Sequence, residues 1–595
     1  MFNIDVKKEG RDYYVLHFLY DKNLIDLIKL LPKREYLANL KAWKVDALNL
    51  YNLILNFKGS REVFFNFGGE QERQDFITKY KKALVKHEKE EAANAIKLQV
   101  RQEFLDLKTL LESQEVIDFD YSKYLGDGVV PFRHQIVGAT LAHKARKLLF
   151  AMGLGSGKSL ASLLASEMFG DEIKKVIIIA PNSLKYNWRN EINKFTKGQK
   201  YYILNGKNEY TWQEAKYFIT NFEYFSSSAF DFNKKIKAFG IEEPDMFIID
   251  EIHKLNNTKS NRTKRIKDYF KNAESPNIVA LTGTPITNGK LAELYNILNF
   301  LDPQEFSSKS RFFIDYCGMA YIPDQYGWVQ TRDAKLEEMN AKLQHLMYRV
   351  KTQDVLKNLP EFRINKIYID MTSEQQKIYQ EIESGMRNID WSASSFLADK
   401  KEEGKNMGFL ELIGKLRQYT STLKLDTVKD FITTLNEDGE KVVTFDTYIN
   451  PLKELTEYFS HNSRLYYGGV DSFVRQSYVD DFQASDNKLQ NLFMSIQSGN
   501  VGLTLTAACN LIMLGLPLTP SDAEQCYARI YRNGQLRPVT VYLFIVKDTI
   551  DEYIDNLLAS KLKISMKVID NEEYTDNSSE SLVSELFSIY KKLSK

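Results

Sequence analysis

The sequence contains little cysteine, and this scarcity excludes two classes of site. Its three cysteines, Cys317, Cys509 and Cys526, lie far apart, form no CxxC pair and are accompanied by only seven scattered histidines. Disulfide frameworks and zinc sites need more cysteines or histidines at closer spacing. We therefore expect three small buried thiols and neither a zinc site nor a disulfide scaffold.

Long apolar runs and an excess of one charge are also missing. No apolar run approaches the roughly 20 residues of a membrane-spanning helix, and the N-terminus lacks the apolar core of a signal peptide. Lys and Arg number 80 against 79 Asp and Glu, so any nucleic acid must be bound through local patches. We expect a monomer without membrane contact, cytoplasmic in a bacterium or virus-infected cell or otherwise intracellular.

One glycine-rich stretch, 151–159, lies between an apolar run typical of a buried strand and a helical pattern. Glycines let backbone N–H groups close on phosphates, and the helix N-terminus adds partial positive charge. In such a P-loop, Lys158 would reach the β- and γ-phosphates and the Ser159 hydroxyl would bind Mg²⁺. Met152 stands where the strict motif has glycine, so a plain strand-to-helix turn is the alternative.

The region from 126 to about 305 alternates strands, loops and helices. Its apolar runs 176–180, 246–249 and 278–281 show no alternation, which favours strands buried on both faces of a parallel sheet. In such sheets the ligand lies at the carboxyl ends of the strands. We therefore expect 181–183, 250–251 and 282–284 to surround the P-loop. There Asp250 could hold Mg²⁺, and Glu251 could orient and deprotonate the attacking water.

A second α/β region begins near 366, with strands expected at 442–445, 492–496, 511–514 and 539–544. Between the last two, Gln525, Arg529 and Arg532 are spaced four and three residues apart, which predicts one helical face. Two arginines so placed could stabilise the γ-phosphate in the transition state. The alternative is an ordinary basic helix face.

The chain thus divides into six expected segments, and the fold class is α/β. Alternation and short helical patterns predict a small α+β module at the N-terminus, in which Trp43 either contacts DNA or belongs to the core. Mixed charges at i, i+4 spacing predict a helical connector after it. The boundaries are 1–65 for the α+β module, 66–125 for the connector, 126–305 for the first lobe, 306–365 for an inter-lobe helical segment, 366–565 for the second lobe and 566–595 for an acidic linker with a terminal helix.

Taken together, residues 130–555 resemble the Swi/Snf-type branch of superfamily-two helicases and translocases, which have two tandem RecA-like lobes. Besides the P-loop, the matching motifs are 180–191, the DEAH-box-like 250–257, 281–294, the joining segment 349–360, 499–506 and 525–552. Two positions depart from the family pattern. Ile252 replaces a small residue of the DEAH box, and Leu518-Thr519-Pro520 replaces Trp-Asn-Pro.

The resemblance implies roles for individual residues, with ATP and Mg²⁺ as cofactors. Nucleotide binding falls to Gln135 as the adenine reader and to Gly153, Gly155, Ser156, Gly157, Lys158 and Ser159. Ser159 and Asp250 would hold the metal, and the catalytic set would be Lys158, Asp250, Glu251, Arg529 and Arg532. His253, Thr282, Gly283, Thr284, Gly502 and Gln525 would couple hydrolysis to movement, and Ser183, Trp188, Thr504, Thr506 and Trp43 are the candidate DNA contacts.

A weaker likeness concerns the N-terminal module. The segments 24–36 and 41–51 resemble the small HARP-type module of annealing helicases, which implies recognition of branched or forked DNA.

The expected function is therefore an ATP-dependent translocase on double-stranded DNA, which would remodel or anneal DNA or displace proteins from it. A strand-separating DNA helicase or an RNA helicase is one alternative. A non-hydrolysing, ATP-gated DNA-binding scaffold is another, but it would be expected to lack Lys158, Glu251 or Arg532, and all three are present.

Overall fold

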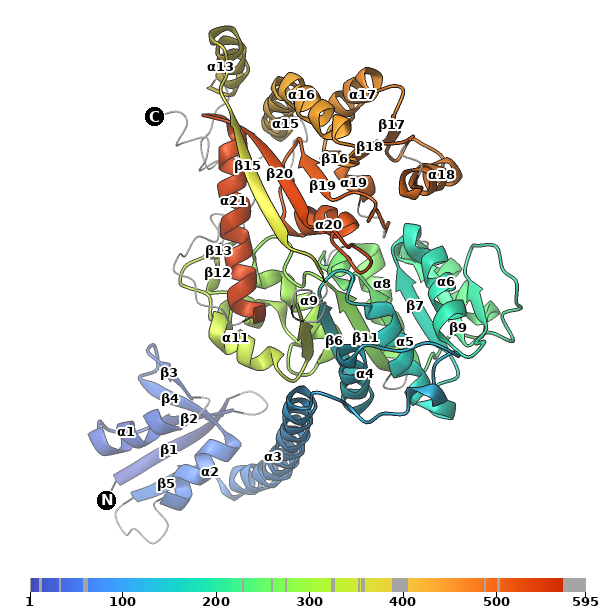
Figure 1. The fold of residues 1–595 in the computed structure, drawn as a ribbon. Helices are drawn as coiled ribbons and strands as arrows, with labels where there is room; N and C mark the ends of the chain where they lie inside the picture. The colour runs from blue at the N-terminus through green and yellow to red at the C-terminus, as the bar shows by residue number, and fades with distance from the viewer. Residues whose placement is uncertain are drawn as a thin grey trace. The chain divides into compact units, whose positions relative to one another are not determined.

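The computed structural model of the chain is shown in Figure 1. It contains two compact units, Met1–Asp106 and Leu107–Lys595, which are described separately below. It describes residues 2–570 except 10–12, 32–33, 57–62, 227–228, 258–259, 273–275, 323–326, 352–353, 355–358, 388–404, 486–487 and 500–502. Most of the expected C-terminal segment 566–595 therefore lies outside the described residues.

The first unit is a mixed β-sheet with two helices. Its elements are β1 (Phe2–Glu9), β2 (Tyr13–His17), α1 (Lys22–Leu30), β3 (Arg34–Leu37), β4 (Ala42–Asp46), α2 (Ala47–Asn56) and β5 (Val63–Phe67). The strand order is β3-β4-β2-β1-β5, with β1 and β5 parallel and the other pairs antiparallel. Alternate strand residues such as Ile4, Tyr14 and Leu16 pack against Ile28 and Leu50 of the helices.

The expected connector is one helix, α3 (Glu70–Ser113), of 44 residues. Phe76, near its start, is buried in the core of the first unit. Farther along, exposed pairs four residues apart support the helix, as where the Gln102 amide donates to Asp106 Oδ1 at 2.8 Å.

The second unit contains two large sheets and a two-stranded one, and the first large sheet is entirely parallel. Its seven strands follow the order β14-β6-β11-β10-β7-β9-β8. The strands are β6 (Lys147–Met152), β7 (Val176–Ala180), β8 (Tyr201–Ile203), β9 (Tyr217–Asn221), β10 (Met246–Asp250), β11 (Asn277–Thr282) and β14 (Met347–Val350). The apolar runs predicted as strands are confirmed, and the central strands are buried on both faces.

Helices cover both faces of this sheet (Figure 1). They are α4 (Arg133–Ala145), α5 (Lys158–Met168), α6 (Lys185–Phe195), α7 (Ala229–Ala238), α8 (Asn261–Asn272), α9 (Leu294–Leu301), α10 (Lys309–Asp315) and α11 (Leu336–Leu343). Ile177 and Ile179 of β7 and Phe247 and Ile249 of β10 lie in one apolar cluster with side chains of α8, α9 and α11, because alternate strand residues share a face.

The sequence had suggested that the segment 306–365 is helical, but the structure shows that it is not helical throughout. It includes the antiparallel pair β12 (Met319–Ile322) and β13 (Gly327–Gln330), and β14, which joins the first sheet beside β6. Four-residue strands give a periodicity signal too short to separate from a helix.

The second sheet of this unit is also parallel, with the order β15-β20-β19-β16-β18-β17. Its strands are β15 (Phe362–Ile369), β16 (Val442–Asp446), β17 (Ser463–Tyr466), β18 (Asn491–Ser495), β19 (Asn510–Met513) and β20 (Val539–Val546). Its helices are α13 (Ser373–Arg387), α15 (Lys405–Leu423), α16 (Leu425–Glu437), α17 (Ile449–Tyr458), α18 (Ser472–Gln483), α19 (Ile496–Gly499), α20 (Pro520–Ile530) and α21 (Ile550–Ser565).

Two apolar clusters sandwich this sheet. Val443 and Phe445 of β16 face one cluster with α18, α20 and α21, whereas Val442 faces the other with α16 and α17. The expected α/β fold with two parallel sheets is thus confirmed. A π-helical turn, Met566–Asp570, follows α21. None of the helices among the described residues is long and apolar enough to cross a membrane.

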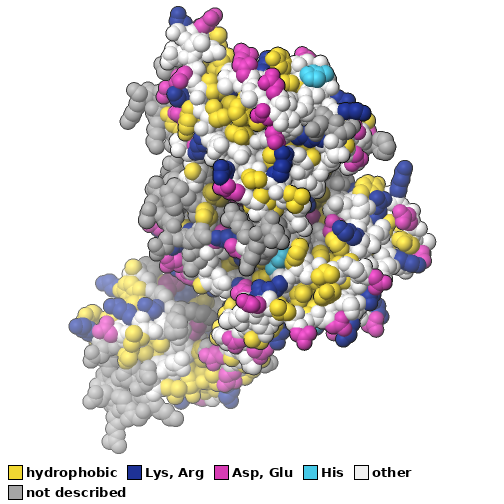
Figure 2. Space-filling model, viewed as in Figure 1, with side chains coloured by type: hydrophobic (Ala, Val, Ile, Leu, Met, Phe, Trp, Pro, Cys, Tyr) yellow, Lys and Arg dark blue, Asp and Glu magenta, His cyan; other side chains and the backbone are white. Residues whose placement is uncertain are grey.

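Charge is mixed over the visible surface. On the face shown in Figure 2, Lys and Arg side chains are interspersed with Asp and Glu. This matches the balanced composition of the sequence.

Candidate nucleotide-binding site

The glycine-rich loop connects β6 to α5, and its glycines are required by its backbone. Gly155 and Gly157 have φ of 78° and 76°, a left-handed conformation that disfavours any side chain. A Cβ at Gly157 would also clash with the Gln135 amide. The N-terminus of α5, at Lys158, therefore opens directly onto the loop, as an anion site requires.

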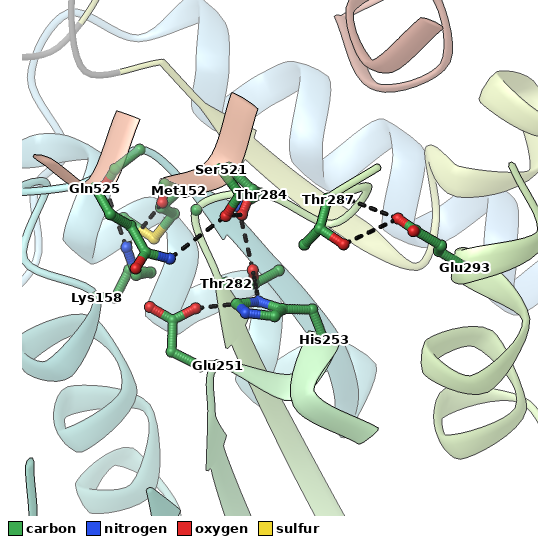
Figure 3. A network of polar contacts seen from close by, with 12 residues as sticks. Met152, Lys158, Glu251, His253, Thr282, Thr284, Thr287, Glu293, Ser521 and Gln525 are labelled. Atoms are coloured by element: carbon green, nitrogen blue, oxygen red, sulfur yellow. Dashed lines mark hydrogen bonds and ion pairs between the residues drawn. The ribbon is translucent and has the colours of Figure 1, made fainter. Parts of the chain in front are cut away.

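Lys158 lies folded against this loop. Its ammonium group donates to Met152 O at 3.0 Å and to Gly153 O at 3.3 Å (Figure 3). Burial lowers the pKa of Lys158, and the nearby Glu251 and Asp250 carboxylates oppose that shift. The side chain is thus close to both carboxylates predicted to share its site.

Gln135, the expected adenine reader, is buried beside the same loop. Its Oε1 accepts from Phe132 N at 2.8 Å, and its Nε2 donates to Ser156 O at 3.0 Å. His134 Nε2 lies 2.7 Å from the same Ser156 carbonyl. Two neighbouring side chains of α4 therefore fix the loop backbone at Ser156.

Asp250 is the last residue of β10. Its hydrogen-bond partner is Trp188, which the sequence analysis had suggested as a DNA contact. The Trp188 indole N–H donates to Asp250 Oδ2 at 3.0 Å. Burial, and next the Glu251 charge, raises the pKa of Asp250 to about 6. Trp188 is only 1% exposed, so its prediction as a DNA contact is wrong. The motif gave the residue a functional position but could not show which way the indole points.

Glu251 has an unusual backbone, with φ of 54° in the left-handed region. Its buried Oε2 has no hydrogen-bond partner and lies 3.2 Å from His253 Nδ1. Burial lowers the pKa of His253 to about 4, so this contact is not an ion pair near neutral pH. Glu251 thus keeps an oxygen available for another donor, such as a water molecule.

A series of polar contacts runs from Glu251 to the second sheet (Figure 3). His253 Nδ1 is 3.0 Å from Thr282 Oγ1, and Thr282 Oγ1 accepts from Thr284 N at 3.1 Å. The Thr284 and Ser521 hydroxyl oxygens then lie 2.8 Å apart. Gln525 Nε2 donates to Ser521 Oγ at 3.4 Å, which completes the series on α20.

Ser521 was not among the predicted residues. Its one sequence signal is its position four residues before Gln525, on the same helix face.

The two predicted arginines, Arg529 and Arg532, do not lie on one helix. α20 ends at Ile530, so the expected single helical face is wrong for Arg532. Arg529 Nε donates to Gln525 O at 3.0 Å, and Arg532 Nη1 donates to Leu503 O at 2.9 Å. Burial, and next the charge of Arg532, lowers the pKa of Arg529 to about 10.

Arg532 belongs to the second sheet and yet contacts the P-loop of the first. A Cβ built at Gly155 would lie 3.3 Å from the Arg532 Cβ. The partly buried Arg532 therefore stands beside the phosphate loop, and the buried Arg529 is near enough for its charge to act on Lys158. A bound polyphosphate would supply balancing negative charge.

The residues present fit a magnesium ion. No cluster of three or more His, Cys, Asp or Glu side chains suited to a metal occurs among the described residues. Mg²⁺ usually takes only one or two protein oxygens and completes its shell with phosphate and water. The Ser159 hydroxyl and the Asp250 carboxylate would supply these two protein oxygens.

The remaining predicted residues differ in their exposure and in their contacts. Ser183 and Thr504 are exposed, whereas Thr506 Oγ1 accepts from Gln483 Nε2 at 3.3 Å. Trp43 is partly buried in the first unit, with its ring 5.0 Å from that of Tyr36. Gly502 lies outside the described residues. Contact of these side chains with DNA stays a prediction.

Comparison with known proteins agrees with this arrangement. Residues 51–425 match the model of the SNF2-related domain, and residues 423–534 match that of the helicase conserved C-terminal domain. The chain is 26% identical over 472 residues to a Xenopus tropicalis protein, the SWI/SNF-related matrix-associated actin-dependent regulator of chromatin subfamily A-like protein 1. This match covers 77% of this chain and 47% of that protein. It is 25% identical over 464 residues to the Bos taurus DNA annealing helicase and endonuclease ZRANB3, covering 76% and 42%.

Among solved structures, the Sulfolobus solfataricus SWI2/SNF2 ATPase core in complex with dsDNA matches with 21% identity and a TM-score of 0.34, covering 74% of this chain and 94% of that one. The chain spans less than half the length of the two curated relatives described above. Because the SNF2-related model alone matches more than half of its residues, the chain belongs to the SNF2-related family and also carries a helicase conserved C-terminal domain.

Proposed function

We propose that this protein is an ATP-dependent translocase on double-stranded DNA. The observation that supports it best is the meeting of the P-loop with Arg532, which follows α20 beside the second sheet, with Arg529 of α20 close enough for its charge to act on Lys158. A site divided between two sheets changes shape when its ligand is cleaved, because each sheet holds a different part of the ligand. That property distinguishes a motor from a static nucleotide-binding protein.

In this proposal each part of the site has one task. The loop amides from Gly153 to Gly157 and the Lys158 ammonium bind the phosphates, and the Gln135 amide reads the adenine. The Lys158 side chain exchanges its Met152 and Gly153 carbonyl partners for phosphate oxygens, which are stronger acceptors.

Ser159 and Asp250 would hold Mg²⁺, which neutralises charge on the phosphates when bound. The indole of Trp188 fixes the orientation of Asp250. Glu251 orients the attacking water through its carboxylate and takes its proton. Arg529 and Arg532 stabilise the charge that develops on the transferred phosphate.

The contacts from Glu251 to Ser521 supply a route from hydrolysis to movement. Thr282 ends β11 of the first sheet, and His253 and Thr284 follow strands β10 and β11. Ser521 and Gln525 lie on α20, which packs against the second sheet. Loss of the phosphate alters the surroundings of Glu251 at one end of this series of contacts. The helix α20, at the other end, then moves. Gly283 lies within this stretch of backbone and belongs to the same coupling group.

Support for DNA as the track comes from the relatives. One relative is named as a DNA annealing helicase and one matched core is described with dsDNA. Because the surface charge is mixed, DNA phosphates would have to be contacted through local patches, without base reading. The N-terminal unit, with its likeness to the HARP-type module, would direct the motor to forked or branched DNA.

The test is ATP hydrolysis by the wild type and by Glu251→Gln, with no nucleic acid, single-stranded DNA, duplex DNA, forked DNA or RNA. We expect strong stimulation by duplex or forked DNA, which the variant loses. Stimulation by RNA alone would favour an RNA helicase. Nucleotide-dependent DNA binding without turnover by the wild type would favour the non-hydrolysing scaffold, and both results contradict the proposal.

A further inference from the structure

The turn Met566–Asp570 crosses from the second sheet's last helix to the core of the first sheet. Val568 and Ile569 are 0% and 3% exposed and belong to the apolar cluster that α11 and β14 share. Asn340 Nδ2 donates to Val568 O at 2.7 Å, and Lys567 lies 3.1 Å from Glu337. The end of the second half of the motor is thus anchored in the first half.

Arg349 connects this turn to the backbone around the phosphate site. Its Nε and Nη2 donate to the two Asp570 carboxylate oxygens at 2.7 and 3.3 Å. Its Nη1 donates to Ala151 O at 3.1 Å and to Gly283 O at 3.4 Å. One guanidinium therefore holds a carboxylate of the turn and carbonyls at the ends of two strands that border the nucleotide.

These two carbonyls are close to the groups that bind phosphate. Ala151 directly precedes Met152, whose carbonyl accepts from Lys158. Gly153 N donates to Val350 O at 2.8 Å, so the residue after Arg349 also fixes the start of the loop. Gly283 lies between Thr282 and Thr284 of the coupling contacts.

The Arg349–Asp570 pair lies at the edge of the packed core. A hollow of about 240 Å³ adjoins it, lined by both residues and by Lys108, Lys351 and Asp354 among others. The Arg349 side chain is 25% exposed, whereas that of Asp570 is 7% exposed. Water can therefore replace the carboxylate at the guanidinium when the turn moves.

We propose that Arg349 is a positioning residue that transmits the position of the C-terminal turn, through Asp570, to the phosphate loop and to Gly283. This inference rests on the proposed function, since it concerns the same nucleotide site. With the turn in place, Arg349 holds the strand ends in the geometry that binds ATP. When the Asp570 carboxylate is displaced, the guanidinium loses the group that fixes its direction, and the affinity for ATP falls.

The experiment is steady-state ATP hydrolysis, with and without duplex DNA, by full-length variants. Arg349→Ala should raise KM for ATP about tenfold and change kcat at saturating ATP less than about twofold, because it removes bonds that shape the free site. Asp570→Asn should raise KM in the same direction but less. The double variant should resemble Arg349→Ala, because Asp570 acts through Arg349.

Lys567→Gln is the matched control, since it removes another ion pair of the same turn that does not reach the nucleotide site. We expect wild-type KM from it. Equal KM values for Asp570→Asn and Lys567→Gln would overturn the proposal, as would additive effects of the two single variants. Asp570→Glu keeps the charge and should restore a KM near wild type, which a general loss of packing would not allow.

Thermal unfolding and binding of a fluorescent ATP analogue complete the test. If Asp570→Asn unfolds at a lower temperature, analogue binding well below that temperature still decides the outcome. If the wild type binds the analogue but hydrolyses no ATP, the proposed function fails, while the order of analogue affinities still tests Arg349. If the wild type hydrolyses ATP and all variants match it, only the inference about Arg349 fails.

Discussion

At the scale of single residues, Trp188 decides how Asp250 is presented to its ligand. The indole N–H donates to Asp250 Oδ2 at 3.0 Å and so fixes the orientation of the carboxylate. Trp188→Phe removes only this donor and leaves the ring, so kcat for ATP should fall about tenfold while duplex affinity is unchanged. ATP hydrolysis and fluorescence anisotropy with labelled duplex measure the two quantities.

Tyr186→Phe is the control for this change, because Tyr186 is 44% exposed on the same helix. It should leave kcat unaltered. A loss of duplex affinity in Trp188→Phe with normal turnover would instead restore the DNA contact that the sequence suggested.

Asp446 gives a prediction about pH and stability. It ends β16, is fully buried and has an Oδ2 without a hydrogen-bond partner. Burial raises its pKa to about 6, above the unfolded value of about 3.9. The folded protein therefore binds the extra proton between these values, and stability from this group falls as pH rises through that window.

Asp446→Asn removes this charge while an oxygen remains for Tyr448 N, which donates to Asp446 Oδ1 at 2.9 Å. We expect it to stabilise the protein at pH 7.5 by on the order of 2 kcal/mol and to have a much smaller effect at pH 4.5. Urea unfolding at the two pH values measures this. A variant that is less stable than wild type at pH 7.5 would show that the carboxylate has a stabilising partner when ionised.

At the scale of elements, α20 links the nucleotide site to the second sheet through Ser521. Its hydroxyl meets Thr284 at 2.8 Å and accepts from Gln525. Ser521→Ala should leave DNA-independent hydrolysis within about twofold and lower the stimulation by duplex several-fold, because the contacts between sheets are broken while each half-site is intact. The ratio of stimulated to basal turnover is the measurement.

Thr519→Ala separates this effect from simple weakening of the helix. Thr519 is the N-cap of α20, and its Oγ1 accepts from Asp522 N at 3.2 Å. Losing the cap should lower stability by about 1 kcal/mol without changing the stimulation ratio. An equal drop in that ratio in both variants would assign the effect to helix stability.

The elements also show what the sequence could reveal. β7, β10 and β11 were predictable because strands buried on both faces must be apolar throughout, and the P-loop because its left-handed glycines are needed for its shape. β3 and β14, of four residues each, were not, since their own pattern is short, and the partner of β14, β6, is also distant in sequence. α20 ends at Ile530, where Tyr531 leaves the helical conformation with ψ of 84°, and residue spacing alone does not show this end.

At the scale of the whole molecule, the nucleotide site is assembled from both sheets of the second unit. Thr284 and Ser521 are 237 residues apart in sequence, and Gly155 and Arg532 meet across an even longer separation. Motif resemblance assigned Gly155, Thr284 and Arg532 to one site but did not include Ser521, and only packing shows which atoms meet. The resemblance also placed Trp188 near DNA, because a motif records position and not direction.

The central claim is that hydrolysis at this site moves the protein along duplex DNA. Displacement of a third strand from a DNA triplex tests it most directly, with wild type and Glu251→Gln, with ATP and with a non-hydrolysable analogue. We expect wild type with ATP to release the third strand while the duplex strands stay paired, and the other three combinations to release none. Rapid ATP hydrolysis that leaves the triplex intact, or that separates the duplex strands, would contradict the account.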